Sequence, residues 1–376
     1  VVQRLATLGM PEHSAAGKAD LLHAIDRQVP LRSATIGWTP GRVELLGKHT
    51  DYAGGHSLVF PVDRGFVTAW RSSDTATLSV IDAMTGERID VPLEADAPPR
   101  PGHWSNYAIS VVRRLAGNFP RTWRGGVIAF ASDLPQASSS SSALLTAMLL
   151  AMVDLNNLDA DATWRCCFPD RLRLAGYAGT IENGRPYEDL AGDGGVGTFG
   201  GSEDHAAILC GRPGTIARFA FAPLRRVEDL PWPDGQALAI ASSGVVAEKT
   251  GAAREQYNQA ALLADRLAEL WTVATGRSVP VAQIIDEGPD AVRQLRDLIA
   301  RNASPAERDA LARRLDHLAH EHGVCIPQAA DALRVGDLPV FVDAVARSQR
   351  GAEELLGNQV DQTRWLAEEA VDLGAT

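Results

Sequence analysis

An apolar segment near the middle of the chain most strongly limits how this chain can fold. The segment from Ala143 to Val153 is apolar except for Thr146. It is too short to span a bilayer, because a spanning helix needs roughly 18 to 25 apolar residues. A strand-like stretch, residues 126–130, and a run of five serines, Ser138 to Ser142, precede it. We therefore expect a strand, a loop and a buried helix in succession.

The character of the sequence changes near residue 212. Before it, stretches rich in Val, Ile, Thr and aromatic residues alternate with loops, and after it amphipathic helical patterns dominate. The predicted strands are Ser33 to Trp38, Leu58 to Trp70, Thr77 to Asp82, Gly126 to Phe130, Thr215 to Phe221 and Ala237 to Ser242. Further predicted helices are Arg171 to Asn183, Ala252 to Trp271, Pro305 to His322, Ile326 to Arg334 and Pro339 to Leu356. The mixture of predicted strands and helices indicates an α+β protein. The 376 residues amount to about two domains, and we place them at 1–212 and 213–376.

Charge and cysteine content exclude several classes of protein. With 36 basic and 47 acidic residues, the net charge of −11 argues against a nucleic acid or an anionic membrane surface as the main partner. The four cysteines form no CxxC pair and have no histidine at zinc spacing. We therefore expect reduced cysteines in a cytoplasmic protein. Any anion that this chain binds must be met by a local site.

A dense polar motif runs from Gly41 to Gly55. It places Arg42, Lys48, His49 and Asp51 within ten residues, flanked by glycines that allow close backbone approach. Such a density of donors and acceptors suits a small polyhydroxylated ligand. The alternative is a solvated β-turn, because turns are commonly polar.

Two further segments carry potential chemistry. The serine run enters the apolar helix near Ser142, where free backbone N–H groups can cradle an anion and hydroxyls can reach a cation. A flexible serine linker is the alternative. A glycine-dense segment precedes Asp204, which lies just inside a predicted helix start. A carboxylate there is stabilised by the helix dipole, so capping alone could also explain Asp204.

Taken in order, the three segments resemble those of one enzyme family. The motif at 41–55 closely resembles the sugar-binding signature of galactokinase, within the GHMP family of galactokinase, homoserine kinase, mevalonate kinase and phosphomevalonate kinase. The resemblance extends from about Trp38 to Tyr257. It implies a two-domain GHMP kinase fold, with a ribosomal protein S5 domain 2-like domain for nucleotide and sugar and a ferredoxin-like C-terminal domain.

The resemblance also implies roles for individual residues, with ATP and Mg²⁺ as cofactors. Asp204 matches the catalytic base, and Arg42 the arginine beside the reacting hydroxyl and the γ-phosphate. Ser142 and Glu182 match the Mg²⁺ ligands. The implied sugar-binding residues are Arg42, Lys48, His49, Asp51, Gly201 and Tyr257. The implied ATP-binding residues are Ala137, Ser138, Ser139, Ser140, Ser141, Ser142 and Ala143.

The implied reaction is ATP-dependent phosphorylation of the anomeric hydroxyl of galactose or a related hexose. Sugar and ATP would be the partners of a monomer or dimer, without nucleic acid or membrane. Lys48 stands where the family has a glutamate that accepts from the C6 hydroxyl, so a C6 carboxylate, as in galacturonate, is an alternative substrate. Lys48 could instead turn outward or pair with Glu44 or another carboxylate.

Two other departures from the family leave a further alternative. The phosphate loop, Pro135 to Ala143, has no glycine and is about two residues short. The family's last glycine-rich motif is not found in the C-terminal domain, which we expect to lack it. A catalytically impaired, galactokinase-like sugar sensor is therefore the second alternative to an active kinase.

Overall fold

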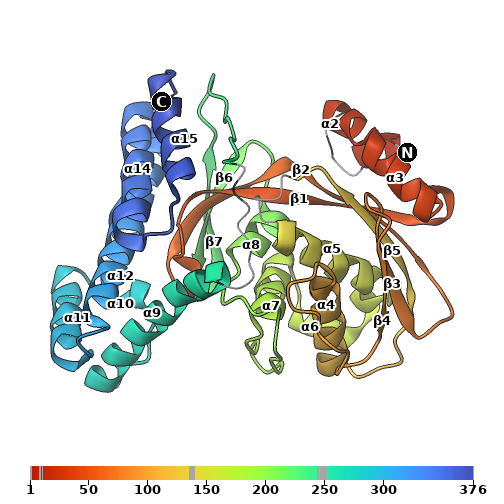
Figure 1. Cartoon of the computed structure of the whole chain (residues 1–376), viewed down its shortest axis with the longest axis horizontal. Coiled ribbons are helices and arrows are strands. Elements are labelled where there is room, and N and C mark those ends of the chain that lie inside the picture. Colours follow the sequence, from red (N-terminus) through yellow and green to blue (C-terminus); the bar gives the residue numbers. More distant parts are fainter. Residues whose placement is uncertain are drawn as a thin grey trace. The chain divides into compact units, whose positions relative to one another are not determined.

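A computed structural model describes residues 2–7, 10, 12–134, 140–243, 245 and 252–375 (Figure 1). The chain divides into two compact units. Unit one comprises Val1–Val43, Pro61–Thr198 and Asp204–Cys210, and unit two comprises Glu44–Phe60, Phe199–Glu203 and Gly211–Thr376. The last point at which the chain passes from unit one to unit two, after Cys210, lies next to the predicted boundary at 212. However, packing also assigns two earlier segments, 44–60 and 199–203, to unit two. That domains 1–212 and 213–376 have separate functions stays a prediction.

The sheet of unit one is built around β5 (Gly126–Ser132). It lies between β2 (His56–Ser72) and β3 (Thr77–Asp82), and β4 (Arg88–Pro92) follows β3 at the edge. The β2–β5 pair is antiparallel, with Thr68 opposite Phe130, whereas β3 and β5 are parallel. A further strand, β1 (Thr35–Leu46), pairs with β2, and these two strands contribute residues to both units.

Helices cover both faces of this sheet (Figure 1). On one face, Leu22 and Ile25 of α3 (Ala19–Gln28) pack with Val67, Ala129 and Ala131. On the other, α4 (Ser105–Asn118) and α5 (Ser140–Leu155) contact the strands, for example through the hydrogen bond from Trp70 Nε1 to Asp154 Oδ2 at 2.6 Å. The helices of unit one are α1 (Val2–Thr7), α2 (Glu12–Gly17), α3 (Ala19–Gln28), α4 (Ser105–Asn118), α5 (Ser140–Leu155), α6 (Ala162–Cys167), α7 (Arg171–Asn183) and α8 (Glu203–Cys210).

The strands of unit two continue from the N-terminal end of β2. Residues 56–59 pair with β6 (Thr215–Phe221), which forms an antiparallel hairpin with β7 (Leu224–Pro231). Leu58, Ile216 and Leu230 from these strands pack on Leu333 and Phe341. This cluster packs helices α13 (Ile326–Val335) and α14 (Leu338–Gly351) against the strands.

The other long elements of unit two are helices in the part of the chain that the structure describes. Leu267, Leu295, Leu311 and Leu315 are fully buried in one cluster that joins α9 to α12. The helices are α9 (Ala252–Thr275), α10 (Val281–Asp286), α11 (Pro289–Asn302), α12 (Arg308–His320), α13 (Ile326–Val335), α14 (Leu338–Gly351) and α15 (Asp361–Asp372). Two π-helical turns, Glu321–Cys325 and Ala352–Leu356, follow α12 and α14.

The predicted helix at 143–153 is confirmed and begins three residues earlier, at Ser140. Its side chains are buried almost all round, as expected for a helix without a polar face. The predicted strand at 237–242 is wrong: these residues form no regular structure, and Ile240 is 62% exposed. Alternating apolar residues make a strand only where a neighbouring strand can pair with them.

A buried arginine fastens the loop after α7 to unit one. Arg114, from α4, is 1% exposed. Its guanidinium donates hydrogen bonds to the backbone oxygens of Ala191 (2.7 Å), Thr180 (2.7 Å) and Arg185. Asp193 Oδ1 lies 3.6 Å from Nη1. The one side chain thereby holds both the end of α7 and the chain that follows it.

We expect Arg114→Met to lower the free energy of unfolding by about 2 to 4 kcal/mol, because three carbonyls lose a charged donor that is itself buried. Arg113→Met is the matched control. Its guanidinium Nε lies 3.7 Å from Asp193, and its side chain is 18% exposed, so the loss should stay below about 1 kcal/mol. Urea denaturation of both variants measures the difference, and equal losses would contradict the role of Arg114.

Candidate functional site

The first part of the site is an ion pair in unit one. Arg42 lies near the end of β1, and Asp204 is the second residue of α8. Arg42 Nε donates to Asp204 Oδ1 at 2.7 Å, and Nη2 also contacts this oxygen. Both side chains are 18% exposed, so solvent still reaches the pair. A partly exposed carboxylate held by a guanidinium is kept ionised and in a fixed orientation.

A serine hydroxyl lies between two carboxylates next to this pair. Ser142, in the first turn of α5, is buried, and its Oγ lies 2.7 Å from Glu182 Oε2 and 2.9 Å from Asp204 Oδ2. A hydroxyl has one hydrogen and can donate it to only one carboxylate. The three groups therefore present more acceptors than donors, which suits a cation.

The donor set fits Mg²⁺ better than a metal held by protein side chains alone. Among the described residues, no group of three or more His, Cys, Asp and Glu side chains is arranged to hold a metal. Mg²⁺ commonly takes one or two protein oxygens and completes its shell with water and substrate phosphates. Ser142 and Glu182 are the residues that would hold it.

The helix start offers a place for phosphate beside these oxygens. Ser140, Ser141, Ser142 and Ala143 form the first turn of α5, where backbone N–H groups lack intrahelical acceptors. The other expected ATP-binding residues, Ala137, Ser138 and Ser139, lie outside the described residues. The structure thus brings Arg42, Asp204, Glu182 and the serines of α5 together within unit one.

Two residues of this cluster gave no sequence signal. His205 is buried next to Asp204, with Nε2 3.4 Å from Glu182 Oε2. Tyr107 of α4 is hydrogen-bonded to Ser141, and burial raises its pKa to about 12, so the phenol keeps its proton. Only the spacing of Tyr107 on an amphipathic helix could have indicated that it faces α5.

The second part of the site is the turn after β1, in unit two. Gly41 to Leu46 belong to the strand, so the solvated-turn alternative applies at most to the residues after it. Thr50 N–H donates to Gly47 O at 3.0 Å, and Asp51 starts a short 3₁₀ turn. Gly47 and His49 have positive φ angles of 117° and 58°. His49 and Asp51 thus come from a compact turn in which His49 itself has a left-handed backbone conformation.

A glycine segment from before α8 lies against Asp51. A Cβ on Gly201 would lie 2.3 Å from Asp51 Oδ2, so only glycine permits this approach. Phe199 N–H donates to Asn258 Oδ1 at 2.9 Å, and the Tyr257 hydroxyl lies against Gly200. Within unit two the structure therefore brings Asp51 and Gly201 together and places Tyr257 beside the same segment.

His49 and Lys48 point to different neighbours. The His49 and Tyr257 rings lie 5.0 Å apart. Lys48 Nζ donates to Gln349 Oε1 of α14 at 3.3 Å, and Gln349 Nε2 donates to Glu353 Oε1 at 2.9 Å. Within the described ranges Lys48 forms no ion pair, so the expected alternative of pairing with Glu44 is not what the structure has. Its charge meets a neutral amide.

The sequence also gave no indication of two buried residues that support this turn. Arg314 of α12 bonds to His49 O and Tyr52 Oη. Glu321 Oε1 accepts from Gly47 N–H at 2.8 Å and from Ser348 Oγ at 2.9 Å. Both lie more than 260 residues from the turn in sequence, and no local pattern marks them.

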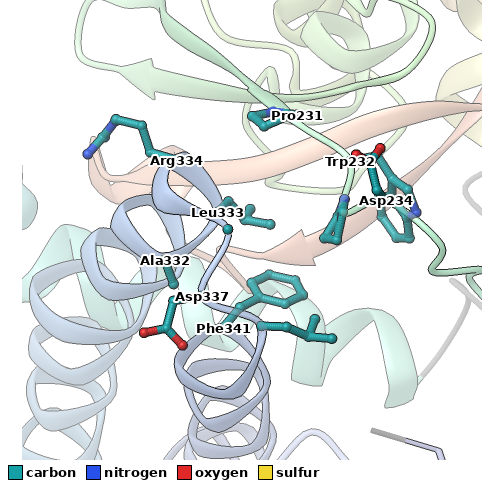
Figure 2. Close-up of a pocket in the computed structure, with 11 residues that line it drawn as sticks. Pro231, Trp232, Asp234, Ala332, Leu333, Arg334, Asp337 and Phe341 are labelled. Carbon is teal, nitrogen blue, oxygen red and sulfur yellow. The ribbon is translucent and has the colours of Figure 1, made fainter.

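A cavity of about 210 Å³ lies elsewhere in unit two, between the end of β7 and helices α13 and α14. Figure 2 shows Leu333 and Phe341 on its helical side and Pro231 and Trp232 on the opposite side. None of the expected site residues lines this cavity. It therefore takes no part in the site described above.

Comparison with known proteins supports the reading of the first motif. Residues 32–72 match the family model described as the galactokinase galactose-binding signature. A galactokinase of Actinobacillus pleuropneumoniae is 24% identical over 98% of this chain and 84% of its own length. A galactokinase of Actinobacillus succinogenes is 30% identical over 35% of this chain and 37% of its own length.

One solved structure shares the fold over nearly the whole chain. It is the Lactococcus lactis galactokinase complexed with galactose, with a TM-score of 0.71 and 19% identity. The alignment covers 93% of this chain and 82% of that one. The expected mixed kinase fold is therefore confirmed, and the S5-like and ferredoxin-like descriptions of its two domains stay predictions. Separately, no helix in the described part of the chain is long and apolar enough to cross a membrane.

The arrangement of Ser142 and Glu182 predicts how the protein responds to Mg²⁺. Saturating Mg²⁺ should raise the melting temperature of the wild type by about 2 °C or more, because a bound cation satisfies the excess acceptors. In Glu182→Gln the shift should largely vanish. Differential scanning fluorimetry with and without Mg²⁺ measures both, with Glu188→Gln, an exposed glutamate of the same unit, as the control. Equal shifts in wild type and Glu182→Gln would contradict the assignment.

Proposed function

Because this chain is a galactokinase-like member of the GHMP kinase family, we propose that it is an ATP-dependent sugar 1-kinase. It would transfer the γ-phosphoryl group of ATP to the anomeric hydroxyl of galactose or a related hexose. The observation that carries the proposal is the cluster of Arg42, Asp204, Ser142 and Glu182 in unit one. Phosphoryl transfer needs a positioned acceptor and stabilised phosphate charge more than covalent chemistry, and these residues supply both.

Each side chain has a distinct task in this proposal. Asp204 accepts a hydrogen bond from the sugar hydroxyl and takes its proton as the phosphorus–oxygen bond forms. Arg42 holds the Asp204 carboxylate ionised and can place its remaining N–H groups toward the transferred phosphoryl group. The N–H groups at the start of α5 bind phosphate oxygens. Mg²⁺, when bound, neutralises phosphate charge.

The residues of unit two would bind the sugar. Asp51 offers carboxylate oxygens, His49 a ring nitrogen, and Tyr257 an aromatic face and a hydroxyl. A mixture of acceptors and donors around an aromatic side chain suits a polyhydroxylated ring. Galactose is the first candidate, since the matched signature is the galactose-binding one.

Galacturonate is the second candidate, and one observation favours it. Lys48 bonds to the neutral Gln349 rather than to a carboxylate among the described residues. An ammonium group without a protein counter-ion would gain an ion pair from a sugar carboxylate at C6. The hydrogen bond to Gln349, at 3.3 Å, is weak enough to be exchanged for such a contact.

We expect Asp204→Asn to lower kcat by about 10² to 10⁴-fold, because the amide cannot accept the proton from the hydroxyl. ATP affinity should change little, as measured by calorimetric titration. Asp154→Asn is the control, because Asp154 is distant from the cluster in sequence and the amide oxygen can still accept from Trp70 Nε1. Its turnover should match the wild type. Full turnover by Asp204→Asn would contradict the base assignment, and sugar binding without any turnover in the wild type would identify a sensor.

Replacement of Lys48 tests the choice between neutral and acidic sugars. Lys48→Glu should lower the ratio of kcat/KM for galacturonate to that for galactose by about 100-fold, since an attraction becomes a repulsion. Lys48→Met, which removes the charge without reversing it, should give an intermediate ratio. A coupled ADP-release assay with both sugars measures the ratio, and the same ratio in all three proteins would exclude Lys48 from substrate choice.

A further inference from the structure

His49 occupies an unusual backbone conformation in the turn after β1. Its φ of 58° lies in the left-handed region, which few residues other than glycine adopt and which costs free energy that the surroundings must offset. The contact that holds it comes from α12: Arg314 Nη2 donates to His49 O at 2.5 Å. The conformation of His49 therefore depends on a residue far away in the sequence.

Each nitrogen of the Arg314 guanidinium donates at least one hydrogen bond, and no described acidic side chain pairs with it. The side chain is 2% exposed and forms no ion pair within the described part of the chain. Its other bonds run from Nε to Ala260 O at 3.1 Å, from Nη1 to His317 Nδ1 at 2.8 Å and from Nη2 to Tyr52 Oη at 3.2 Å. A guanidinium has only donors, so every one of these partners must accept. The direction of each hydrogen bond around Arg314 is thereby fixed.

This direction determines where the Tyr52 hydrogen goes. Tyr52 Oη accepts from Arg314, and its remaining neighbour among the described residues is His49 Nδ1 at 2.8 Å. If Nδ1 carried a hydrogen, the phenol hydrogen would be buried without an acceptor, which is unfavourable. Burial also raises the pKa of Tyr52, so the phenol stays protonated. Tyr52 therefore donates and His49 Nδ1 accepts.

We propose that Arg314 and Tyr52 fix His49 as the neutral tautomer with its hydrogen on Nε2, so that His49 meets the sugar as a hydrogen-bond donor. The proposal rests on the proposed sugar-binding function of this turn. Arg314 and Tyr52 are positioning residues, since they act on the sugar through His49.

The surroundings favour a neutral ring. Arg314 contacts His49 O, and the charges of Arg314, Lys48 and His49 all act on the neighbouring His317 ring, so a charged His49 would add to two existing cations. Burial and the Arg314 charge lower the pKa of His317 to about 2, so this ring stays neutral as well. Asp51 is an acceptor two residues away in the sequence. His49 and Asp51 together offer one donor and one acceptor, which matches sugar hydroxyls that both accept and donate.

Nitrogen NMR of the full chain with ¹⁵N-labelled histidine tests the proposal directly. In the wild type, the His49 signals, assigned by their loss in His49→Gln, should show a bare Nδ1 and a protonated Nε2. Tyr52→Phe keeps the ring but removes the donor, and should give a mixture of the two tautomers. Tyr177→Phe is the matched control: it also removes a buried phenol, which donates to Asn118 Oδ1 at 2.9 Å in unit one, and should leave the His49 signals unchanged.

Kinetics supply a second readout. Tyr52→Phe should raise the KM for the sugar about tenfold and leave the KM for ATP within about twofold, a split that general unfolding would not produce. A wild-type His49 with its hydrogen on Nδ1, an imidazolium, or a tautomer unaffected by Tyr52→Phe would overturn the proposal. The NMR measurement does not depend on turnover, so a protein without kinase activity would contradict the proposed function while the tautomer is still decided.

Discussion

The ion pair between Arg42 and Asp204 is the interaction on which the chemistry of unit one depends. It joins the end of β1 to the start of α8, two elements separated by 162 positions. Asp204 Oδ1 is occupied by the guanidinium, which leaves Oδ2 toward Ser142. If Arg42 were absent, the carboxylates of Asp204 and Glu182 would lie beside the serine hydroxyl without the positive charge of the guanidinium. One arginine therefore allows a base and a cation site to lie side by side.

Helix boundaries were predictable wherever local chemistry sets them. α7 begins after Asp170, whose side chain accepts from Arg173 N–H, and ends at Gly184, which has a φ of 81°. Caps of this kind act within one turn, so the sequence alone shows them. The predicted helix start beside Asp204 is also confirmed, since α8 begins at Glu203, where a carboxylate favours the positive end of the helix dipole.

The extent of β1 was not predictable, because its glycines are required by contacts with residues that are distant in the sequence. A Cβ on Gly37 would lie 2.8 Å from the Trp70 ring, and a Cβ on Gly41 would lie 2.4 Å from Leu134. These glycines make room for side chains of other segments, whereas in the sequence they look like turn residues. The predicted strand consequently stopped at Trp38, eight residues before the observed end at Leu46.

The residues of the candidate site also divide into those that a local sequence pattern reveals and those that it does not. Arg42, His49, Asp51 and Asp204 lie in short motifs that a single sequence displays, whereas Arg314 lies on an ordinary amphipathic helix. Burying a guanidinium without a carboxylate partner is costly, and its hydrogen bonds offset only part of that cost. An apolar residue at position 314 would avoid the cost of burying a charge, but it would leave the carbonyls of Ala260 and His49 without this donor and could not direct the Tyr52 hydrogen. The buried charge at this position is therefore explained by the acceptors that it holds in place around the turn.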